Sequence, residues 1–184
     1  EEPLSMHELQ NLMHQLITGG YETTQSAINH GMWALIRFPD IAEKIYEDES
    51  LLKPFIEEVL RWESPVQFLL RRTSKDVEVS GTVIPKDSMV MMGYGPANRD
   101  EEKFSCPHQF QLNREGVGAH MAFGSGAHHC PGALLGRQEM IRSFKFLVQR
   151  MKNIKIDKPL QEPVHNFSMF FMPMKEFFIT FDKR

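Results

Sequence analysis

One uninterrupted helical pattern constrains this chain more than any other feature. Ser5, followed three residues later by Glu8, forms a capping box, which marks the start of a helix. A helix over residues 5–38 would be a rod of about 50 Å, so we expect it to cross the whole molecule. Gly19 and Gly20 lie near its middle, where each glycine costs about 1 kcal/mol relative to alanine. We therefore expect a compensating reason for this glycine pair.

The remaining patterns predict a mainly α fold with small β-sheets. Further helices are predicted over residues 40–48, 51–62 and 132–151, a hairpin over 77–79 and 82–84, and a strand over 177–181. Residues 93–126 are rich in glycine, asparagine, aspartate and proline and predict an irregular stretch. An irregular stretch of that length inside a compact domain is usually functional.

Composition excludes some classes of function. The formal net charge is −3 and charged residues make up 24% of the 184 residues, so we expect no nucleic-acid binding, which requires clustered positive charge. No run of eighteen apolar residues occurs, so we expect no membrane-spanning segment. Two cysteines do not make a disulfide scaffold, and we expect a reducing, cytoplasmic location.

The segment 123–132, which reads Phe-Gly-Ser-Gly-Ala-His-His-Cys-Pro-Gly, carries the chemistry of the sequence. Its glycines allow positive φ angles and a close approach of the backbone to a ligand. Cys130 lies just before a predicted helix, whose N-terminal dipole and free N–H groups favour the thiolate. A thiolate ligand gives electron density to a haem iron and so favours O–O cleavage.

Two simpler interpretations of Cys130 compete with a haem ligand. A lone Gly-x-x-x-Cys pattern is more often a buried cysteine in a glycine loop. A zinc site has weak support, because Cys130 has no second cysteine at metal-binding spacing. His128 and His129 also lie too close in sequence to complete the usual spaced ligand set.

The full string decides between these interpretations. Phe123, Gly126, His128, Cys130 and Gly132 form the pattern Phe-x-x-Gly-x-His-x-Cys-x-Gly, which resembles the signature of the cytochrome P-450 family. Three further stretches are similar to family motifs in the family's order: 19–24 to the oxygen-activation segment of the distal helix, 58–61 to Glu-x-x-Arg, and 97–114 to the meander. The resemblance identifies residues 1–184 as the C-terminal part of a single P-450 domain.

On the cysteine side, the resemblance implies a haem b cofactor with Cys130 as the ligand to its iron. Phe123 would pack against the sulfur or the porphyrin, and the signature glycines would lie against the cofactor. His128 and Arg71 would bind the haem propionates, because a guanidinium pairs bidentately with a carboxylate. Arg72 is the competing candidate for the role of Arg71.

The resemblance also implies a structural ion-pair triad. Glu58, Arg61 and Arg114 would form a buried cluster that locks the core on the cysteine side. Burying such charges is costly, and removing one member leaves the others without a partner. The role of the triad would therefore be structural and not catalytic.

On the distal side, Gly19 or Gly20 would leave room beside the iron for dioxygen, which would account for the glycine penalty. Thr23 resembles the alcohol of the oxygen-activation segment, and Glu22 resembles the acid that supplies protons. Without the other motifs, both would be read as ordinary residues of a helix surface.

The resemblance implies a monooxygenase that oxidises a small, hydrophobic organic substrate with electrons from a ferredoxin or a flavodoxin. Arg137, Arg142 and Lys145 would offer that donor a positive face, and a solvated helix face explains them equally well. A peroxide-driven enzyme is the first alternative, and the Glu22–Thr23 pair argues against it. The second is an interaction module without activity, which the short chain favours and the complete motif set opposes.

Members of this family normally carry an N-terminal half with further helices, more sheet and further haem contacts. This sequence starts at the distal helix, so we expect it to need that missing half or a complementary chain. The distal face would otherwise be a large exposed apolar patch, which usually requires a partner.

Overall fold

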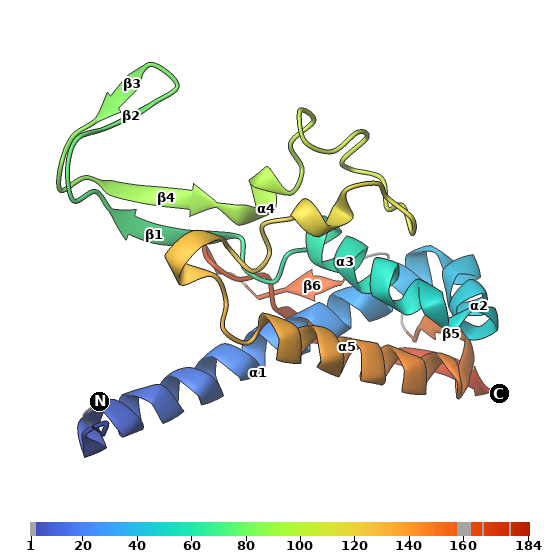
Figure 1. Ribbon diagram of the computed structural model, residues 1–184. Coiled ribbons are helices and arrows are strands. Elements are labelled where there is room, and N and C mark those ends of the chain that lie inside the picture. The colour runs from blue at the N-terminus through green and yellow to red at the C-terminus, as the bar shows by residue number, and fades with distance from the viewer. Residues whose placement is uncertain (1–2, 158–162, 167, 177) are drawn as a thin grey trace.

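Four antiparallel two-stranded sheets surround a group of packed helices in the computed structural model, which describes residues 3–157, 163–166, 168–176 and 178–184 (Figure 1). The helices are α1 (Met6–Arg37), α2 (Pro39–Glu47), α3 (Leu52–Trp62), α4 (Tyr94–Ala97) and α5 (Ala133–Val148), with 3₁₀ helices η1 (Glu49–Leu51), η2 (Val117–Ala119) and η3 (Gly126–His128). The strands are β1 (Phe68–Arg72), β2 (Val77–Val79), β3 (Thr82–Ile84), β4 (Met89–Gly93), β5 (Met151–Ile156), β6 (Val164–His165), β7 (Met174–Glu176) and β8 (Ile179–Lys183). The prediction of a mainly α fold with small sheets is confirmed.

The predicted boundaries lie close to those of the structure. Ser5 caps α1, its hydroxyl accepts a hydrogen bond from the Glu8 amide at 3.3 Å, and its own amide donates to Glu8 Oε2 at 2.8 Å. Strands β2 and β3 pair as the predicted hairpin. The predicted strand over 177–181 corresponds to β8, which starts two residues later, and Phe177 lies outside the described residues.

The core lies where the second half of α1 meets α2, α3 and α5. Phe55 of α3 and Phe144 of α5 are fully buried, and their rings make an edge-to-face contact with centroids 5.1 Å apart. Leu35 of α1 and Ile45 of α2 are buried in the same cluster. Because the inner half of α1 is fixed in this core, the position of the whole helix is set from one end.

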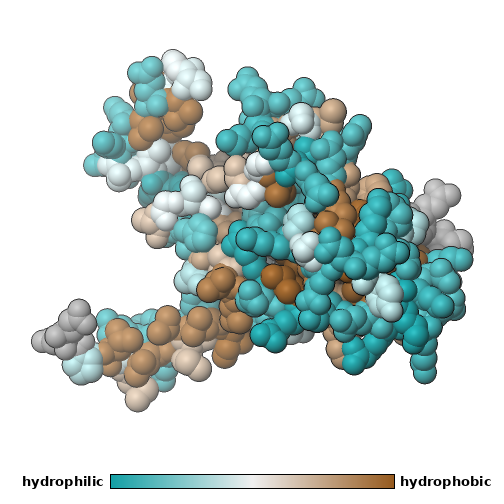
Figure 2. Space-filling model, turned by 45° about the vertical axis from the view of Figure 1, so that its right-hand side comes forward, coloured by the Kyte–Doolittle hydropathy of each residue, from teal (hydrophilic) through white to brown (hydrophobic). Residues whose placement is uncertain are grey.

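The first half of α1 has a different environment. Its residues from Met6 to Gln25 are exposed or half-buried, whereas full burial begins at Ser26. The exposed half carries large apolar side chains: Leu9, Leu12, Met13, Leu16, Ile17 and Tyr21. Figure 2 shows this apolar surface along the projecting helix. An apolar surface of this kind marks a contact site for another chain or segment.

Strands β1 and β4 form an antiparallel ribbon beside the helical core, with Arg71 opposite Val90 and Arg72 opposite Met89. The β2–β3 hairpin extends beyond the far end of this ribbon (Figure 1). Within the residues that the structure describes, no helix combines the length and the apolar character needed to cross a membrane.

Gly31 explains how α1 and α5 approach each other so closely. A Cβ atom at this position would lie 2.2 Å from Phe144 Cζ, which is far inside van der Waals contact. We predict that Gly31→Ala lowers the free energy of unfolding by about 1–3 kcal/mol, the usual range for overpacking a core. Urea unfolding followed by circular dichroism measures the change.

Gly20→Ala on the same helix is the matched control. A Cβ there would meet nothing within 4 Å, so the variant keeps or raises stability through the better helix propensity of alanine. Equal destabilisation by the two variants would contradict the packing explanation for Gly31.

Candidate functional site

The loop before α5 presents Cys130 from a tightly turned backbone. The Cys130 amide donates to the Phe123 carbonyl at 2.9 Å and closes the loop between them. Gly124 and Gly126 have φ angles of 67° and 69°. Residues with a Cβ atom rarely adopt this left-handed region. The Ala133 amide donates to the Cys130 carbonyl at 3.2 Å. The cysteine therefore sits at the entrance to α5, as the sequence predicts.

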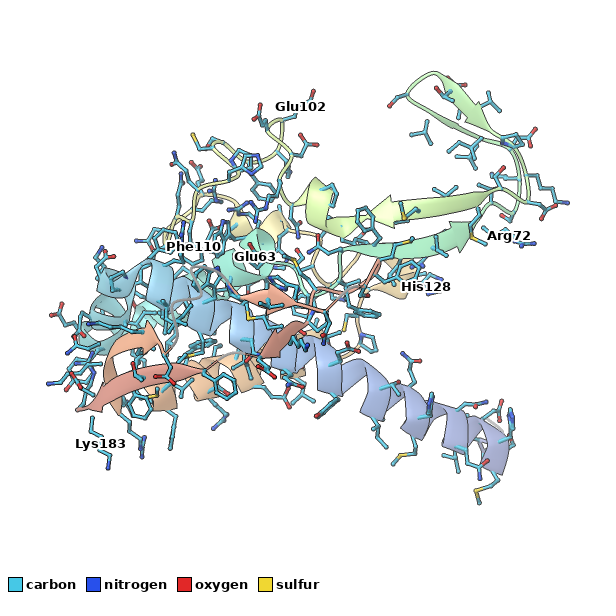
Figure 3. The ribbon with its side chains drawn as sticks, turned by 180° about the vertical axis from the view of Figure 1, so that it is seen from behind. Glu63, Arg72, Glu102, Phe110, His128 and Lys183 are labelled. Atoms are coloured by element: carbon cyan, nitrogen blue, oxygen red, sulfur yellow. The ribbon has the colours of Figure 1, made fainter. Side chains whose placement is uncertain are left out.

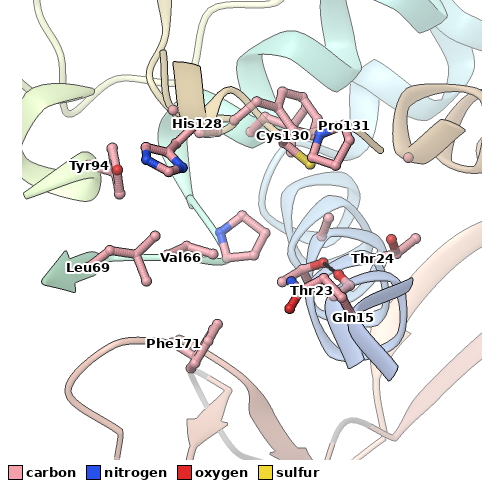
Figure 4. A pocket seen from close by; sticks show the side chains of 18 of the residues that line it. Gln15, Thr23, Thr24, Val66, Leu69, Tyr94, His128, Cys130, Pro131 and Phe171 are labelled. Atoms are coloured by element: carbon pink, nitrogen blue, oxygen red, sulfur yellow. Dashed lines mark hydrogen bonds between the residues drawn. The ribbon is translucent and has the colours of Figure 1, made fainter. Parts of the chain in front are cut away.

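A cavity of about 330 Å³ lies between this loop and α1 (Figure 4). The predicted site residues that line it are Gly19, Thr23, Arg71, Phe123, His128 and Cys130. Gly20, Glu22, Gly126 and Gly132 belong to the same two segments but are not part of its lining. One cavity therefore joins residues that lie more than a hundred positions apart in the sequence.

The α1 wall of the cavity carries an oriented hydroxyl. Thr23 Oγ1 donates to the Gly19 carbonyl at 2.7 Å, one helical turn earlier. A hydroxyl has one proton, so this bond leaves the Thr23 oxygen as a hydrogen-bond acceptor toward the cavity. Glu22, the next residue along the helix, is exposed.

The strand geometry separates the two arginine candidates. Successive side chains of a strand point to opposite faces. Leu69 and Arg71 of β1 both line the cavity, so Arg72 points away from it and is exposed (Figure 3). Arg71 and His128 thus bring two nitrogen-bearing side chains to the cavity lining.

The three residues of the predicted triad meet in one buried network. Glu58 accepts from Arg61 Nε at 2.7 Å and from Arg61 Nη2 at 2.8 Å. Arg114 Nε lies 3.1 Å from both carboxylate oxygens. The Glu58 and Arg61 side chains are fully buried, and that of Arg114 is almost so.

This network also holds the irregular segment between α4 and η2. Arg61 Nη1 donates to the carbonyls of Asn98 at 2.9 Å and Pro107 at 2.8 Å. Arg114 Nη2 donates to the carbonyl of Gln109 at 2.7 Å. The guanidinium groups therefore supply the hydrogen bonds that a regular element would otherwise make within its own backbone.

Glu57, the residue before Glu58, belongs to a second network that sequence reasoning missed. It accepts from Arg137 Nε at 2.7 Å and Nη2 at 3.0 Å, and it lies 2.9 Å from His120 Nε2. Burial alone would raise the pKa of Glu57, but hydrogen bonds from His120 and Arg137 outweigh it and lower the pKa to about 2. No local signal in the sequence marks this network, because His120 lies 63 positions from Glu57.

The basic face expected on α5 is partly neutralised within the chain. Arg137 pairs with Glu57, and Lys145 Nζ lies 2.6 Å from Glu49 Oε1. Arg142 is exposed. Pairing of two of the three cations weakens the prediction that they form a positive docking face.

The cavity fits the haem that the resemblance implies. A soft sulfur donor lies on one wall, and the opposite wall has Gly19, which itself carries no side chain. Arg71 and His128 can both donate hydrogen bonds to carboxylates at one end. Leu69, Met140 and other apolar side chains line the remainder.

The family model for cytochrome P450 matches residues 1–181. The chain belongs to the cytochrome P450 family. The cytochrome P450 CYP107DY1 of Priestia megaterium is 37% identical over 168 residues, which cover 91% of this chain and 41% of that protein. A methyl-branched lipid omega-hydroxylase of Mycobacterium bovis is 36% identical over 181 residues, 97% of this chain and 41% of that protein.

Solved cytochrome P450 structures share the fold. The structure of CYP109Q5 from Chondromyces apiculatus superposes on this chain with a TM-score of 0.93 at 33% identity. The match covers all of this chain and 47% of the CYP109Q5 chain. CYP109E1 from Bacillus megaterium, in complex with corticosterone, gives a TM-score of 0.91 at 33% identity over 97% of this chain and 48% of that one. The chain thus spans less than half the length of these cytochromes P450.

Removing the carboxylate of Glu58 tests how much the first network contributes to stability. We predict that Glu58→Gln lowers the free energy of unfolding by about 3–5 kcal/mol, because two buried guanidinium groups lose their counter-charge. Denaturant unfolding measures this change.

The exposed pair of Asp40 and Lys44 serves as the control, since 65% and 56% of these side chains are accessible. Asp40→Asn should cost less than about 1 kcal/mol, as exposed ion pairs usually do. If Glu58→Gln lowered the free energy of unfolding as little as Asp40→Asn does, the structure would not depend on the network.

Proposed function

We propose that the complete protein is a haem-thiolate monooxygenase that binds haem b through the sulfur of Cys130. The observation that carries this proposal is the shared cavity, because the cysteine and the Thr23 hydroxyl line it from two different elements. Family membership and the bacterial relatives that are named as hydroxylases or monooxygenases support it further.

When bound, the haem supplies the iron at which dioxygen is cleaved, so that one oxygen atom enters the substrate and the other leaves as water with two electrons and two protons. Cys130 contributes electron density through its thiolate. Thr23 contributes an oriented acceptor for an O–H group inside the cavity, because its own proton is held by the Gly19 carbonyl. Glu22 would supply protons from the exposed side of the same helix.

Arg71 and His128 are the proposed partners of the two haem propionates. Both line the cavity from the side of β1 and η3, and both can donate hydrogen bonds to a carboxylate. Phe123 would lie against the porphyrin or the sulfur. Cys130 would hold the iron of the cofactor, and Arg71 and His128 would hold its carboxylates.

We propose a small hydrophobic organic substrate. Val66, Leu69 and Phe171 supply apolar lining away from Cys130. Relatives support this class: one is named as a hydroxylase of methyl-branched lipids, and one solved structure holds corticosterone.

Two partners complete the proposal. The apolar half of α1 would be covered by an N-terminal half of the P450 domain or by a complementary chain, since this chain spans 41% of one relative. Electrons would come from a separate ferredoxin or flavodoxin. A reducing compartment such as the cytoplasm suits Cys106 and Cys130, which are both free thiols.

Cys130→Ser tests the ligand assignment. In protein assembled with the N-terminal half and loaded with haem, we predict that this variant loses the thiolate-type Soret band under carbon monoxide after reduction. Cys106→Ser, which changes an exposed cysteine away from the cavity, should keep that band. Retention of the thiolate-type band in Cys130→Ser would exclude Cys130 as the ligand.

Thr23→Ala tests the distal hydroxyl. We predict that the variant keeps its haem and releases a several-fold larger share of its electrons as hydrogen peroxide, because the cavity loses its oriented acceptor. Thr18→Ala is the control, since Thr18 Oγ1 also donates to the carbonyl four residues earlier, at 2.8 Å, but from an exposed position. Unchanged coupling in Thr23→Ala would remove Thr23 from the mechanism.

A further inference from the structure

Glu57 connects three elements that meet beside the cysteine loop. It lies on α3, Arg137 lies on α5, and His120 follows η2. The Glu57 and His120 side chains are 9% and 1% exposed, and that of Arg137 is 27% exposed. These contacts are therefore largely shielded from water and are stronger than exposed ones of the same length.

The hydrogen bonds of His120 indicate the tautomer of its neutral ring. The Ala122 amide donates to His120 Nδ1 at 3.2 Å, so Nδ1 must be an unprotonated acceptor. The proton of the neutral ring is therefore on Nε2, which donates to Glu57 Oε2 at 2.9 Å. His120 thus links the carboxylate to the backbone of Ala122, one residue before Phe123.

Arg137 links the same carboxylate to the Phe123 side chain. Its guanidinium carbon lies 4.4 Å from the centroid of the Phe123 ring, within the range of a cation–π contact. Two hydrogen bonds to Glu57 fix the plane of this guanidinium. Phe123 in turn accepts the amide hydrogen bond of Cys130 through its carbonyl, at 2.9 Å.

We propose that Glu57 is a positioning residue for Cys130, which it holds through His120 and Arg137 on either side of Phe123. This inference rests on the proposed haem-thiolate function and extends it to a residue that contacts neither the cavity nor the sulfur. Neighbouring residues of a helix point about 100° apart. Glu57 therefore faces the cysteine loop while Glu58 faces the irregular segment.

The first test measures how well the loop shields Cys130 in the chain without haem. In a Cys106→Ser background, only Cys130 reacts with iodoacetamide. We expect Glu57→Gln to raise the alkylation rate several-fold, because a neutral amide with one acceptor oxygen cannot replace the charge-assisted hydrogen bonds that hold both His120 and Arg137. A rate equal to that of the parent chain would overturn the proposal.

Glu63→Gln is the matched control. Glu63 follows the last residue of α3, and its side chain is 15% exposed. It pairs with Arg99 at 3.1 Å, and among the described residues no hydrogen bond or ion pair joins its side chain to residues 120–123. We expect the rate for Cys130 to stay at the parent value in this variant. An equal rise in both glutamine variants would mean that lost stability, and not positioning, controls the loop.

A second variant separates positioning from charge. Arg137→Leu removes the partner of Phe123 and also a positive charge near the sulfur. Loss of the charge alone would lower the reactivity of the thiol, whereas loss of positioning raises it. We expect a rise, and a double variant with Glu57→Gln that reacts no faster than Glu57→Gln alone. A fall in Arg137→Leu would overturn the proposal.

The haem-loaded assembly gives a readout that distinguishes this inference from the function itself. If Cys130 ligates haem, Glu57→Gln should keep a thiolate-type Soret band but shift the reduction potential, while Glu63→Gln should leave the potential unchanged. An unchanged potential in Glu57→Gln would overturn the positioning role and leave the haem-thiolate function intact. Absence of a thiolate-type band in the parent protein would instead refute the function, and the alkylation rates would still decide the role of Glu57.

Discussion

A fully buried carboxylate between two guanidinium groups holds the irregular segment between α4 and η2 in place. Each of Glu58, Arg61 and Arg114 would be a buried charge without a counter-charge if its partners were removed. Their remaining N–H groups bond to backbone carbonyls of the segment between α4 and η2. A segment with little regular structure therefore acquires a defined path, and the cysteine loop that follows it starts from a fixed point.

The cavity depends on that fixed point and on the opposite wall. Its α1 wall is anchored through the inner half of the helix, where Gly31 lets Phe144 approach. Its other wall is a loop closed by the hydrogen bond between Cys130 and Phe123. The two adjacent glutamates of α3 have separate roles. Glu58 fixes the segment before the loop, and Glu57 contacts the side chains around Phe123.

The sequence predicted the elements whose signals are local. The capping box at Ser5 and Glu8 and the alternation of the β2–β3 hairpin depend on neighbours within a few residues. The family resemblance brought together residues that local signals could not connect. The Glu57 network was missed because its partner His120 lies 63 positions away, and no local pattern records a contact over that distance. Arg137 was read as a surface cation for the same reason.

The division of α1 into a buried and an exposed half has a consequence for the order of assembly. The buried half packs with α3 and α5 through contacts that lie wholly within this chain. The frame that carries Cys130 can therefore form while the outer half of α1 is still bare. The cover over the outer half of α1 would then be added to a frame that is already packed.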